Sequence, residues 1–318
     1  MEIPDALVGA RVSLRHRIGE RDGRPLFSDA VGELSADGPA AVLVRTRRGP
    51  VRVERAAVVA VRAVPPAVPR RAPLAAVARL EGLCADAWPA PVDEPHGAWR
   101  LRAAGGYTGR SDSALAIGDP GMPVPEALAE VRRFAREHGI KPRVHAPAGS
   151  PWERAVAEQG WVLDAAHAAG AESAVLVAPL AGAHDPRVEL AERPSAEFWD
   201  LALSAPPSPA QRQVIAPEGE PRTVFGLLRG PSGAALGQVR GALVADHLHL
   251  SLLQVDPSGR RQGLATVLIA AVAAWAQEHD ARWSVLQVAL HNTGARAFYE
   301  RLGHVEHHRY RYLVPPSR

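Results

Sequence analysis

The chain has 318 residues, 47% of them hydrophobic, so it is long enough to fold into two or three domains with cores of their own. No segment approaches the roughly 18 consecutive apolar residues of a membrane-spanning helix, and the first residues, MEIPDALVGARVSLRHR, lack the features of a signal peptide. Cys84 is the only cysteine, which excludes a disulfide framework within the chain and a thiolate-rich metal site. The net charge of +3 is small. From the predicted absence of a membrane span, a signal peptide and disulfides, we expect a cytoplasmic protein that does not associate with membranes.

Residues 1–63 have the pattern of a small all-β domain. Short segments in which apolar and polar residues alternate are separated by Gly-containing turns and predict strands within 10–17, 29–36, 40–54 and 57–64. Their number and length are typical of an SH3-like or tudor-like barrel. Phe27 is the only aromatic residue of this domain, so we do not expect it to stack the bases of a nucleic acid. A role in packing or oligomerisation is the simpler interpretation.

A proline-rich linker and two related α/β halves follow. Segment 64–74 contains VPPAVPRRAP and predicts a semi-rigid linker. In the amphipathic helix predicted at 125–139, FAREHG has a counterpart in WAQEHD at 275–280. After each of these segments the chain continues with a strand, a helix, a glycine and another strand at similar spacing. This repeat predicts one half at about 75–180 and a second at 187–315.

The second half contains a strand, a glycine-rich turn and a helix in immediate succession. HLHLSLLQV at 247–255 alternates like a strand, and LATVLIAAVAAWAQEH at 264–279 has the apolar face of a helix packed on a sheet. The turn between them, DPSGRRQG, brings two arginines to the start of that helix. Free backbone N–H groups and the helix dipole make such a corner suitable for phosphate, although a solvated turn is the alternative.

Two motifs in this half resemble those of the GCN5-related N-acetyltransferases, the GNAT superfamily. The acyl-CoA signature Val-x-Pro-x-x-Arg/Gln-x-x-Gly-x-Gly/Ala matches Val255, Pro257, Arg260, Gly263 and Ala265. After one further predicted strand, WSVLQVAL, the family pattern Asn-x-x-Ala-x-x-Phe/Leu-Tyr-x-x-x-Gly matches Asn292, Ala295, Phe298, Tyr299 and Gly303. The resemblance implies an α/β fold, a mixed and mostly antiparallel sheet flanked by helices, in two tandem halves after the barrel.

The resemblance also implies acetyl-CoA as the cofactor and assigns residues to it. In the family two parallel strands splay apart and hold the pantetheine arm, which here would involve 247–255 and 283–290. The expected cofactor-binding residues are Leu253, Gln254, Val255, Arg260, Arg261, Gln262, Gly263, Leu264, Ala265, Thr266, Asn292, Ala295 and Phe298. Backbone N–H groups near Gln254 and Val255 would polarise the thioester carbonyl.

Catalytic roles follow from the same resemblance. Tyr299 occupies the family's general-acid position, from which its hydroxyl would protonate the departing thiolate; a buried aromatic on an amphipathic helix is the alternative. His249 matches a strand position at which arylalkylamine N-acetyltransferases carry a proton-relaying histidine, and it is the candidate base or relay. Their neighbouring histidine is Ser251 here, so the relay would be incomplete.

The first half lacks the phosphate-binding signature, so we expect it to shape the acceptor cleft of a single active site. Its stretch WRLRAAGGYTGRSD supplies three candidate substrate-binding residues, Tyr107, Arg110 and Asp112. The histidine-rich segment HVEHHRYRY at 304–312 would place His304 and His308 on one face of a strand and His307 on the other. We interpret it as a solvated terminal strand and expect no metal.

The sequence therefore predicts an enzyme that transfers an acetyl group from acetyl-CoA to a primary amine. The acceptor would be an amino acid, an amine metabolite or a peptide, attacked directly in a ternary complex. The alternative is an acyl-CoA-binding regulatory protein whose basic barrel contacts a partner or nucleic acid. The sequence leaves open the acceptor, the length of the acyl chain, the general base and the oligomeric state.

Overall fold

The computed structural model describes residues 3–4, 7–46, 49–64 and 72–316. The chain divides into two compact units, Met1–Arg70 and Arg71–Arg318. Most of the predicted linker, residues 65–71, lies outside the described residues. Within the described part of the chain, no helix is both long and apolar enough to cross a membrane.

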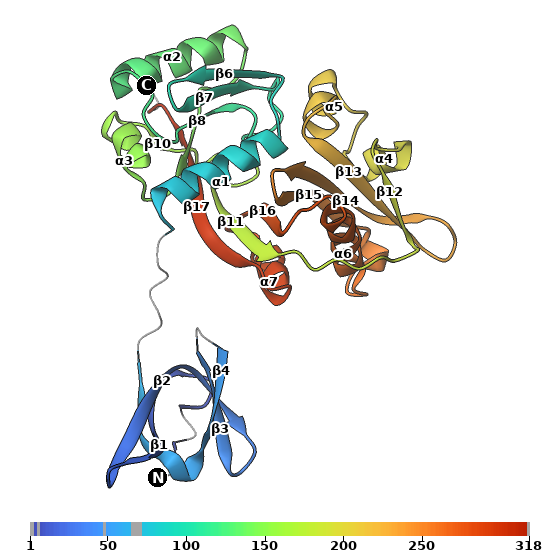
Figure 1. The fold of residues 1–318 in the computed structure, drawn as a ribbon. Helices are drawn as coiled ribbons and strands as arrows, with labels where there is room; N and C mark the ends of the chain where they lie inside the picture. Colours follow the sequence, from blue (N-terminus) through green and yellow to red (C-terminus); the bar gives the residue numbers. More distant parts are fainter. Residues whose placement is uncertain (1–2, 5–6, 47–48, 65–71, 317–318) are drawn as a thin grey trace. The chain divides into compact units, whose positions relative to one another are not determined.

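The first unit is a five-stranded antiparallel sheet that rolls up around one core (Figure 1). Its strands are β1 (Arg11–Arg21), β2 (Arg24–Asp37), β3 (Ala41–Thr46), β4 (Gly49–Glu54) and β5 (Val58–Ala63), in the order β4-β3-β2-β1-β5. Alternate residues of these strands point inward, so that Val12, Leu14 and Leu34 are completely buried. The predicted barrel-like fold is confirmed.

The second unit is built on one mixed sheet with twelve strands. The strands are β6 (Val92–His96), β7 (Trp99–Ala103), β8 (Ser113–Leu115), β9 (Val144–Pro147), β10 (Val162–Leu163), β11 (Glu172–Pro179), β12 (Val188–Ala191), β13 (Arg222–Arg229), β14 (Ala235–Val244), β15 (His247–Val255), β16 (Trp283–Ala289) and β17 (Val305–Val314). The helices are α1 (Leu74–Ala87), α2 (Val124–Glu137), α3 (Pro151–Glu158), α4 (Ala196–Ala202), α5 (Pro209–Ile215), α6 (Leu264–Gln277) and α7 (Thr293–Arg301).

The two halves of this unit exchange their last strands. The sheet runs β12-β13-β14-β15-β16-β11-β17-β9-β8-β7-β6, with β10 paired to β17. Strand β11, which ends the first half in sequence, pairs antiparallel with β16 of the second half, and β17 pairs with β9 of the first. β11 and β17 also pair with each other. The predicted halves are therefore segments of one continuous sheet, a consequence that their separate repeat patterns did not reveal.

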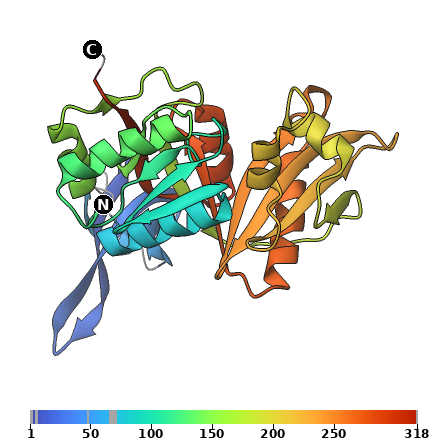
Figure 2. The same ribbon diagram turned by 90° about the horizontal axis from the view of Figure 1, so that it is seen from above.

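Helices cover both faces of the sheet in the second half. Helix α6 packs on β12 to β15 through an apolar face that includes Leu268 and Val272, both completely buried. Helices α4 and α5 lie on the opposite face (Figure 2). There they pack with Trp88, the residue after α1, in a second cluster that also contains Phe198 and Phe225. The first half thereby contributes to the cover of the second half's sheet.

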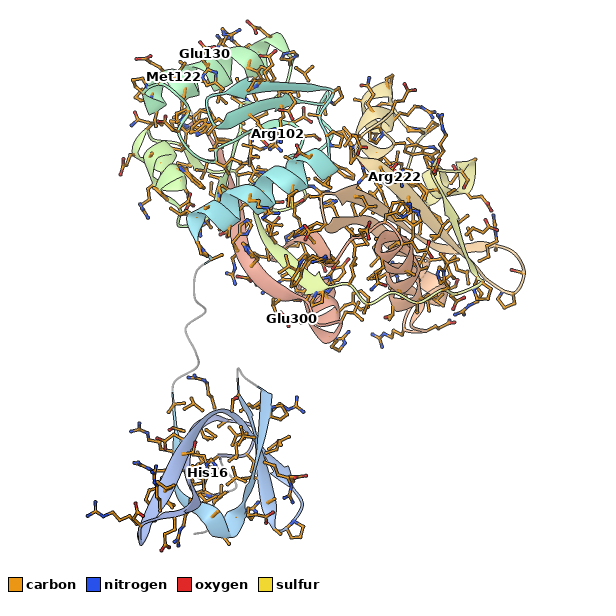
Figure 3. All side chains as sticks on the ribbon, in the orientation of Figure 1. His16, Arg102, Met122, Glu130, Arg222 and Glu300 are labelled. Carbon is orange, nitrogen blue, oxygen red and sulfur yellow. The ribbon has the colours of Figure 1, made fainter. Side chains whose placement is uncertain are left out.

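A buried polar network joins α1 to the exchanged strand. The carboxylate of Glu81 is 3.1 Å from Nε2 of His145 on β9 and 2.8 Å from Nε2 of His308 on β17. Arg102 of β7, labelled in Figure 3, approaches the other ring nitrogen of His145 at 3.5 Å and is itself buried. Burial raises the pKa of Glu81, but His145 and His308 outweigh it and hold the pKa well below its ordinary value. Glu81 is therefore a carboxylate whose charge Arg102 balances across His145.

The histidine-rich segment is not the solvated terminal strand that its alternation suggested. Strand β17 lies inside the sheet between β11 and β9, so both of its edges are paired. His304 is buried with its ring nitrogen 2.7 Å from the hydroxyl of Ser284, and His308 contacts Glu81. The correction follows from the strand exchange, which places the end of the chain in the middle of the sheet.

Substituting Glu81 by alanine should strongly destabilise the second unit. The change removes one of the two carboxylates, Glu81 and Asp93, that stabilise the buried charge of Arg102, and it removes the partner of two histidines. We expect a loss of about 3–5 kcal/mol, as for a broken buried ionic network. Denaturant unfolding followed by tryptophan fluorescence measures it. Arg133→Gln, which breaks an exposed pair on α2, is the control and should leave the unfolding midpoint nearly unchanged. An equal effect of both substitutions would contradict the structural role of the network.

Candidate active site

The parallel strands β15 and β16 separate after a short paired segment. Only three residue pairs join them: His247 with Trp283, Leu248 with Ser284, and His249 with Val285. Beyond these pairs each strand remains bonded to its outer neighbour, β15 to β14 and β16 to β11. The facing backbone groups of the remaining residues are therefore not used in a strand ladder and are available to a ligand.

A β-bulge lies within the diverging part of β15. The register with β14 shifts between the pairs Gln238–Gln254 and Arg240–Ser251, so that two residues of β15 oppose one residue of β14. Leu252 at this bulge has a φ of 51°, a left-handed conformation that costs a leucine about 1–2 kcal/mol. The bulge redirects the end of β15, and it lies next to the predicted ligand-binding residues Leu253, Gln254 and Val255.

The corner after β15 has the geometry expected of an anion cradle. A short 3₁₀ turn at Pro257–Gly259 is followed by Arg260 and Arg261. Gly263, the residue immediately before α6, has a left-handed φ of 76°. Gly263 has no side chain to cap the helix, and no side chain of the described residues does so. The N–H of Thr266 donates to the carbonyl of Gly263, which leaves the N–H groups of Leu264 and Ala265 without a partner of this kind at the start of the 14-residue helix. Both arginine side chains are exposed.

A groove of about 840 Å³ begins at this corner and runs between β15 and α7. Its lining includes every predicted cofactor-binding residue except Gln262, namely Leu253, Gln254, Val255, Arg260, Arg261, Gly263, Leu264, Ala265, Thr266, Asn292, Ala295 and Phe298. Gln262 instead donates to the backbone carbonyl of Ser258 and stabilises the turn. Asn292 has a structural task as well, because its side-chain oxygen accepts from the N–H of Ala295 and caps α7.

Four further residues line the groove that the motifs did not single out: Gly259, Gly294, Arg301 and Leu302. Gly294, Phe298 and Arg301 are spaced by four and three residues, so they share one face of α7. This helical spacing could have identified Gly294 and Arg301 as groove residues from the sequence, once Phe298 was assigned to the groove. Gly259 is required for packing, since a Cβ there would lie 2.9 Å from Leu264.

Tyr299 also lines the groove, next to Phe298 on α7. Its ring lies 5.2 Å from that of Phe298 and 5.5 Å from that of His304. Burial raises the pKa of Tyr299 to about 12. The hydroxyl consequently stays protonated over the whole physiological range and can act as a hydrogen-bond or proton donor towards the groove.

His249 lies on the opposite side of the strands, in a buried and positively charged environment. Its side chain is 1% exposed, and in the described part of the chain neither ring nitrogen forms a hydrogen bond of good geometry. Burial lowers the pKa of His249 well below its ordinary value, as do the nearby charges of Arg110 and Arg240. His249 is therefore neutral at physiological pH and only weakly basic.

Residues of the first half reach the same place. Arg110 donates to the side-chain oxygen of Gln287 on β16 at 2.9 Å, and its guanidinium carbon lies 4.6 Å from the centre of the Trp88 ring. Tyr107 is 6.1 Å from the same ring, centre to centre. Asp112 is separate: its carboxylate accepts from the N–H of Ala104 and stabilises the loop. Of the three predicted substrate residues, two lie near the diverging strands and Asp112 serves the loop that carries them.

Comparison with known families identifies the chain. A family model described as "Probable histone acetyltransferase Rv0428c C-terminal" matches residues 75–313, and one described as "Rv0428c N-terminal Sm-like domain" matches residues 6–62. The chain belongs to this acetyltransferase family. Its fold is that of the GNAT acetyltransferases. The predicted acetyltransferase family, the GNAT fold and the small N-terminal barrel are confirmed.

Solved structures resemble this acetyltransferase, and the first of the two described next shares its fold. The GCN5-related N-acetyltransferase from Kribbella flavida aligns with a TM-score of 0.51 at 19% identity, over 77% of this chain and 95% of that one. A tandem GNAT protein from the clavulanic acid biosynthesis pathway aligns with a TM-score of 0.49 at 16% identity, over 79% and 92%. No curated protein matches the sequence.

The environment of His249 leads to a testable prediction about its charge. Because its pKa is lowered, the imidazole should remain neutral as the pH falls from 8 through about 6.5, where a free histidine is half protonated. Histidine ring ¹⁵N NMR measures this, with the His249 signal assigned by its loss in His249→Gln. A His249 midpoint at or above about 6.5, the value of a free histidine, would contradict the buried cationic environment.

Proposed function

We propose that this acetyltransferase transfers the acetyl group of acetyl-CoA to the primary amine of a small molecule or peptide, at the diverging ends of β15 and β16. The supporting observation is that an anion cradle, a groove and unpaired strand edges are continuous along one path. The groove leads from Arg260 and Arg261 past Val255 to Tyr299.

The residues present suit coenzyme A. The accessible N-terminus of α6 and the exposed Arg260 and Arg261 suit the diphosphate at one end. The space above Gly263 is open, since a Cβ there would meet no atom within 4 Å. Unpaired backbone groups from Leu253 to Val255 would receive the amides of the pantetheine arm in the way that a neighbouring strand would.

Bound acetyl-CoA supplies a thioester that reacts with a neutral amine, forming the C–N bond of the amide and breaking the C–S bond. Backbone N–H groups at Gln254 or Val255 would donate to the carbonyl oxygen of that thioester. The hydroxyl of Tyr299 would donate to the departing sulfur. With a phenol pKa of about 12 and a thiol pKa of about 8.5, full transfer of the proton is uphill, so hydrogen bonding from Tyr299 carries most of this role.

The amine must lose two protons overall, one from its ammonium form before attack and one afterwards. Arg110 and Arg240 disfavour a third cation beside them, so the acceptor would bind as the neutral amine. His249, already neutral, would receive the second proton only in passing, since its low pKa prevents it from keeping the charge, and the proton would leave through the opening between β15 and β16. This makes His249 a relay rather than a base that stores the proton.

The candidate functions differ in the class of acceptor that the enzyme would acetylate. The family's description names histones, which would imply a lysine side chain in a basic peptide. Against this, the side chains around His249 are cationic, which does not favour a basic peptide near the thioester. We therefore propose a small amine, with a peptide as the second candidate. A regulatory protein that only binds acyl-CoA is the competing function, and it has no need for the hydroxyl of Tyr299.

Tyr299→Phe should separate catalysis from binding. We expect kcat to fall by about 10- to 100-fold, the value of one hydrogen bond to a charged group, while the Kd for acetyl-CoA changes little. The measurement is CoA release against a library of amines, together with calorimetric titration of acetyl-CoA.

Arg260→Ala provides the matched control, because it should weaken acetyl-CoA binding without lowering kcat at saturation. If acetyl-CoA binds tightly but no amine accelerates CoA release, the chain is a sensor and the enzymatic proposal fails. Unchanged kcat in Tyr299→Phe would remove that residue from the mechanism.

A further inference from the structure

Two arginines meet beside the proposed reaction centre without a counter-charge. Arg240 of β14 is completely buried, and its three guanidinium nitrogens differ in the hydrogen bonds that they form. Nε donates to the carbonyl of Ile215 at 2.6 Å and Nη1 contacts the hydroxyl of Ser251 at 3.4 Å. Nη2 has no partner within the described parts of the chain. A buried guanidinium with one unused nitrogen is an incomplete site.

Arg110 approaches the same place from the first half. Its guanidinium carbon lies 4.6 Å from the centre of the Trp88 ring, and that of Arg240 lies 5.1 Å from the same ring centre. The loop that carries Arg110 is held firmly, since Nε1 of Trp88 donates to the hydroxyl of Thr108 and the hydroxyl of Ser111 accepts from the N–H of Thr108. The position of Arg110 is thus determined before any ligand arrives.

Carboxylates do not compensate these two charges. Neither arginine takes part in an ion pair between residues that the structure describes. Asp112 is the acid nearest to Arg110 in the sequence, and one oxygen of its carboxylate accepts a hydrogen bond from the N–H of Ala104. Burial and the like charge of Arg110 lower the pKa of Arg240 to about 9. Among the described residues Tyr107 opposes this shift, but burial raises the pKa of Tyr107, so its phenol is uncharged at physiological pH. Packing alone does not explain the arrangement, because an apolar side chain would fill the space at less cost.

The surroundings select the kind of anion that would complete the site. Trp88, Tyr107 and Leu252 belong to one apolar cluster, so a ligand must leave most of its water behind. A carboxylate with a single charge loses less hydration energy there than a phosphate dianion does, and its two oxygens match the fork of an arginine. Arg110 is half-exposed, which leaves this side of the pair open to an incoming group.

We propose that the acceptor carries a carboxylate close to its amine, as an amino acid does, and that Arg110 and Arg240 bind this carboxylate. This inference rests on the proposed function. Ser251, which contacts Arg240, immediately precedes the bulge at Leu252. A carboxylate held by the pair would therefore leave the neighbouring amine directed at the diverging strands. Gln287 would exchange its contact with Arg110 for one with the ligand.

Matched sets of acceptors test the proposal: the common α-amino acids, their carboxamides and their decarboxylated amines. With the wild-type enzyme, kcat/KM should be at least about tenfold higher for an amino acid than for its carboxamide, as expected for one charged hydrogen bond. Arg110→Gln should lower kcat/KM for the amino acid by about 10- to 100-fold more than it lowers kcat/KM for the carboxamide, so that any effect of Arg110 common to all amines cancels in the comparison. Arg240→Lys should act in the same direction.

Arg132→Gln is the matched control, because Arg132 also lies over a tryptophan ring, that of Trp161, but on α2. This substitution should leave kcat/KM unchanged for both the amino acid and its carboxamide. Arg240 also bonds the end of α5, so Arg110→Gln, at a half-exposed position, keeps the test independent of folding. Equal losses for amino acid and carboxamide in Arg110→Gln, or no preference for the carboxylate in the wild type, would overturn the proposal while leaving the acetyltransferase function intact.

Calorimetric titration of the same amino acids in the presence of CoA gives a readout without turnover. Binding that is lost in Arg110→Gln supports the carboxylate site even if no acceptor is acetylated, in which case the proposed function fails alone. Absence of amino acid binding to the wild type, together with acetylation of simple amines, would overturn the carboxylate site and retain the function.

Discussion

The separation of β15 from β16 after three residue pairs is the constraint on which the site depends. Each strand is held along its outer edge, β15 by β14 and β16 by β11, so the gap does not close by sliding one strand towards the other. The bulge at Leu252 maintains the divergence by adding a residue to β15. Backbone groups left unpaired inside a sheet cost about 1–3 kcal/mol each unless a ligand bonds them. The gap therefore exposes backbone groups that a ligand could bond, and the neighbouring strands hold it open.

The strand exchange explains how a half without a phosphate cradle contributes to this site. Because β11 supports β16 and β17 lies against β9, the two halves are fixed to each other by backbone hydrogen bonds. Trp88 then packs into the cover of the second half's sheet, and the adjoining loop delivers Arg110 to Gln287. The network around Glu81 stabilises the same junction from α1. In the proposed function, one half would thus hold the cofactor while the other would help to define the acceptor side.

Much of the groove could be predicted because its signals are local. Gly263 adopts a positive φ directly before a helix, and the arginines and glycines around it are contiguous in the chain. The residues of α7 that line the groove can be predicted from helical periodicity once one of them, such as Phe298, is assigned to the groove. Gln262 illustrates the limit of motif transfer: it lies within the motif, yet its side chain turns back to Ser258 and stays out of the groove.

The sequence by itself determined the order of elements, the anion cradle before α6 and the small barrel, because turn geometry and hydrophobic period depend on neighbouring residues. Only the tertiary structure decided which strands pair, how His304 and His308 are buried, and that Arg110 meets Gln287 from 177 positions away. It also decided that Arg240, the one charged residue of β14, lies beside Arg110 and forms no ion pair with an acid of the described residues. Such relationships arise from long-range packing, in which the energy of a charge is set by partners that no local pattern specifies.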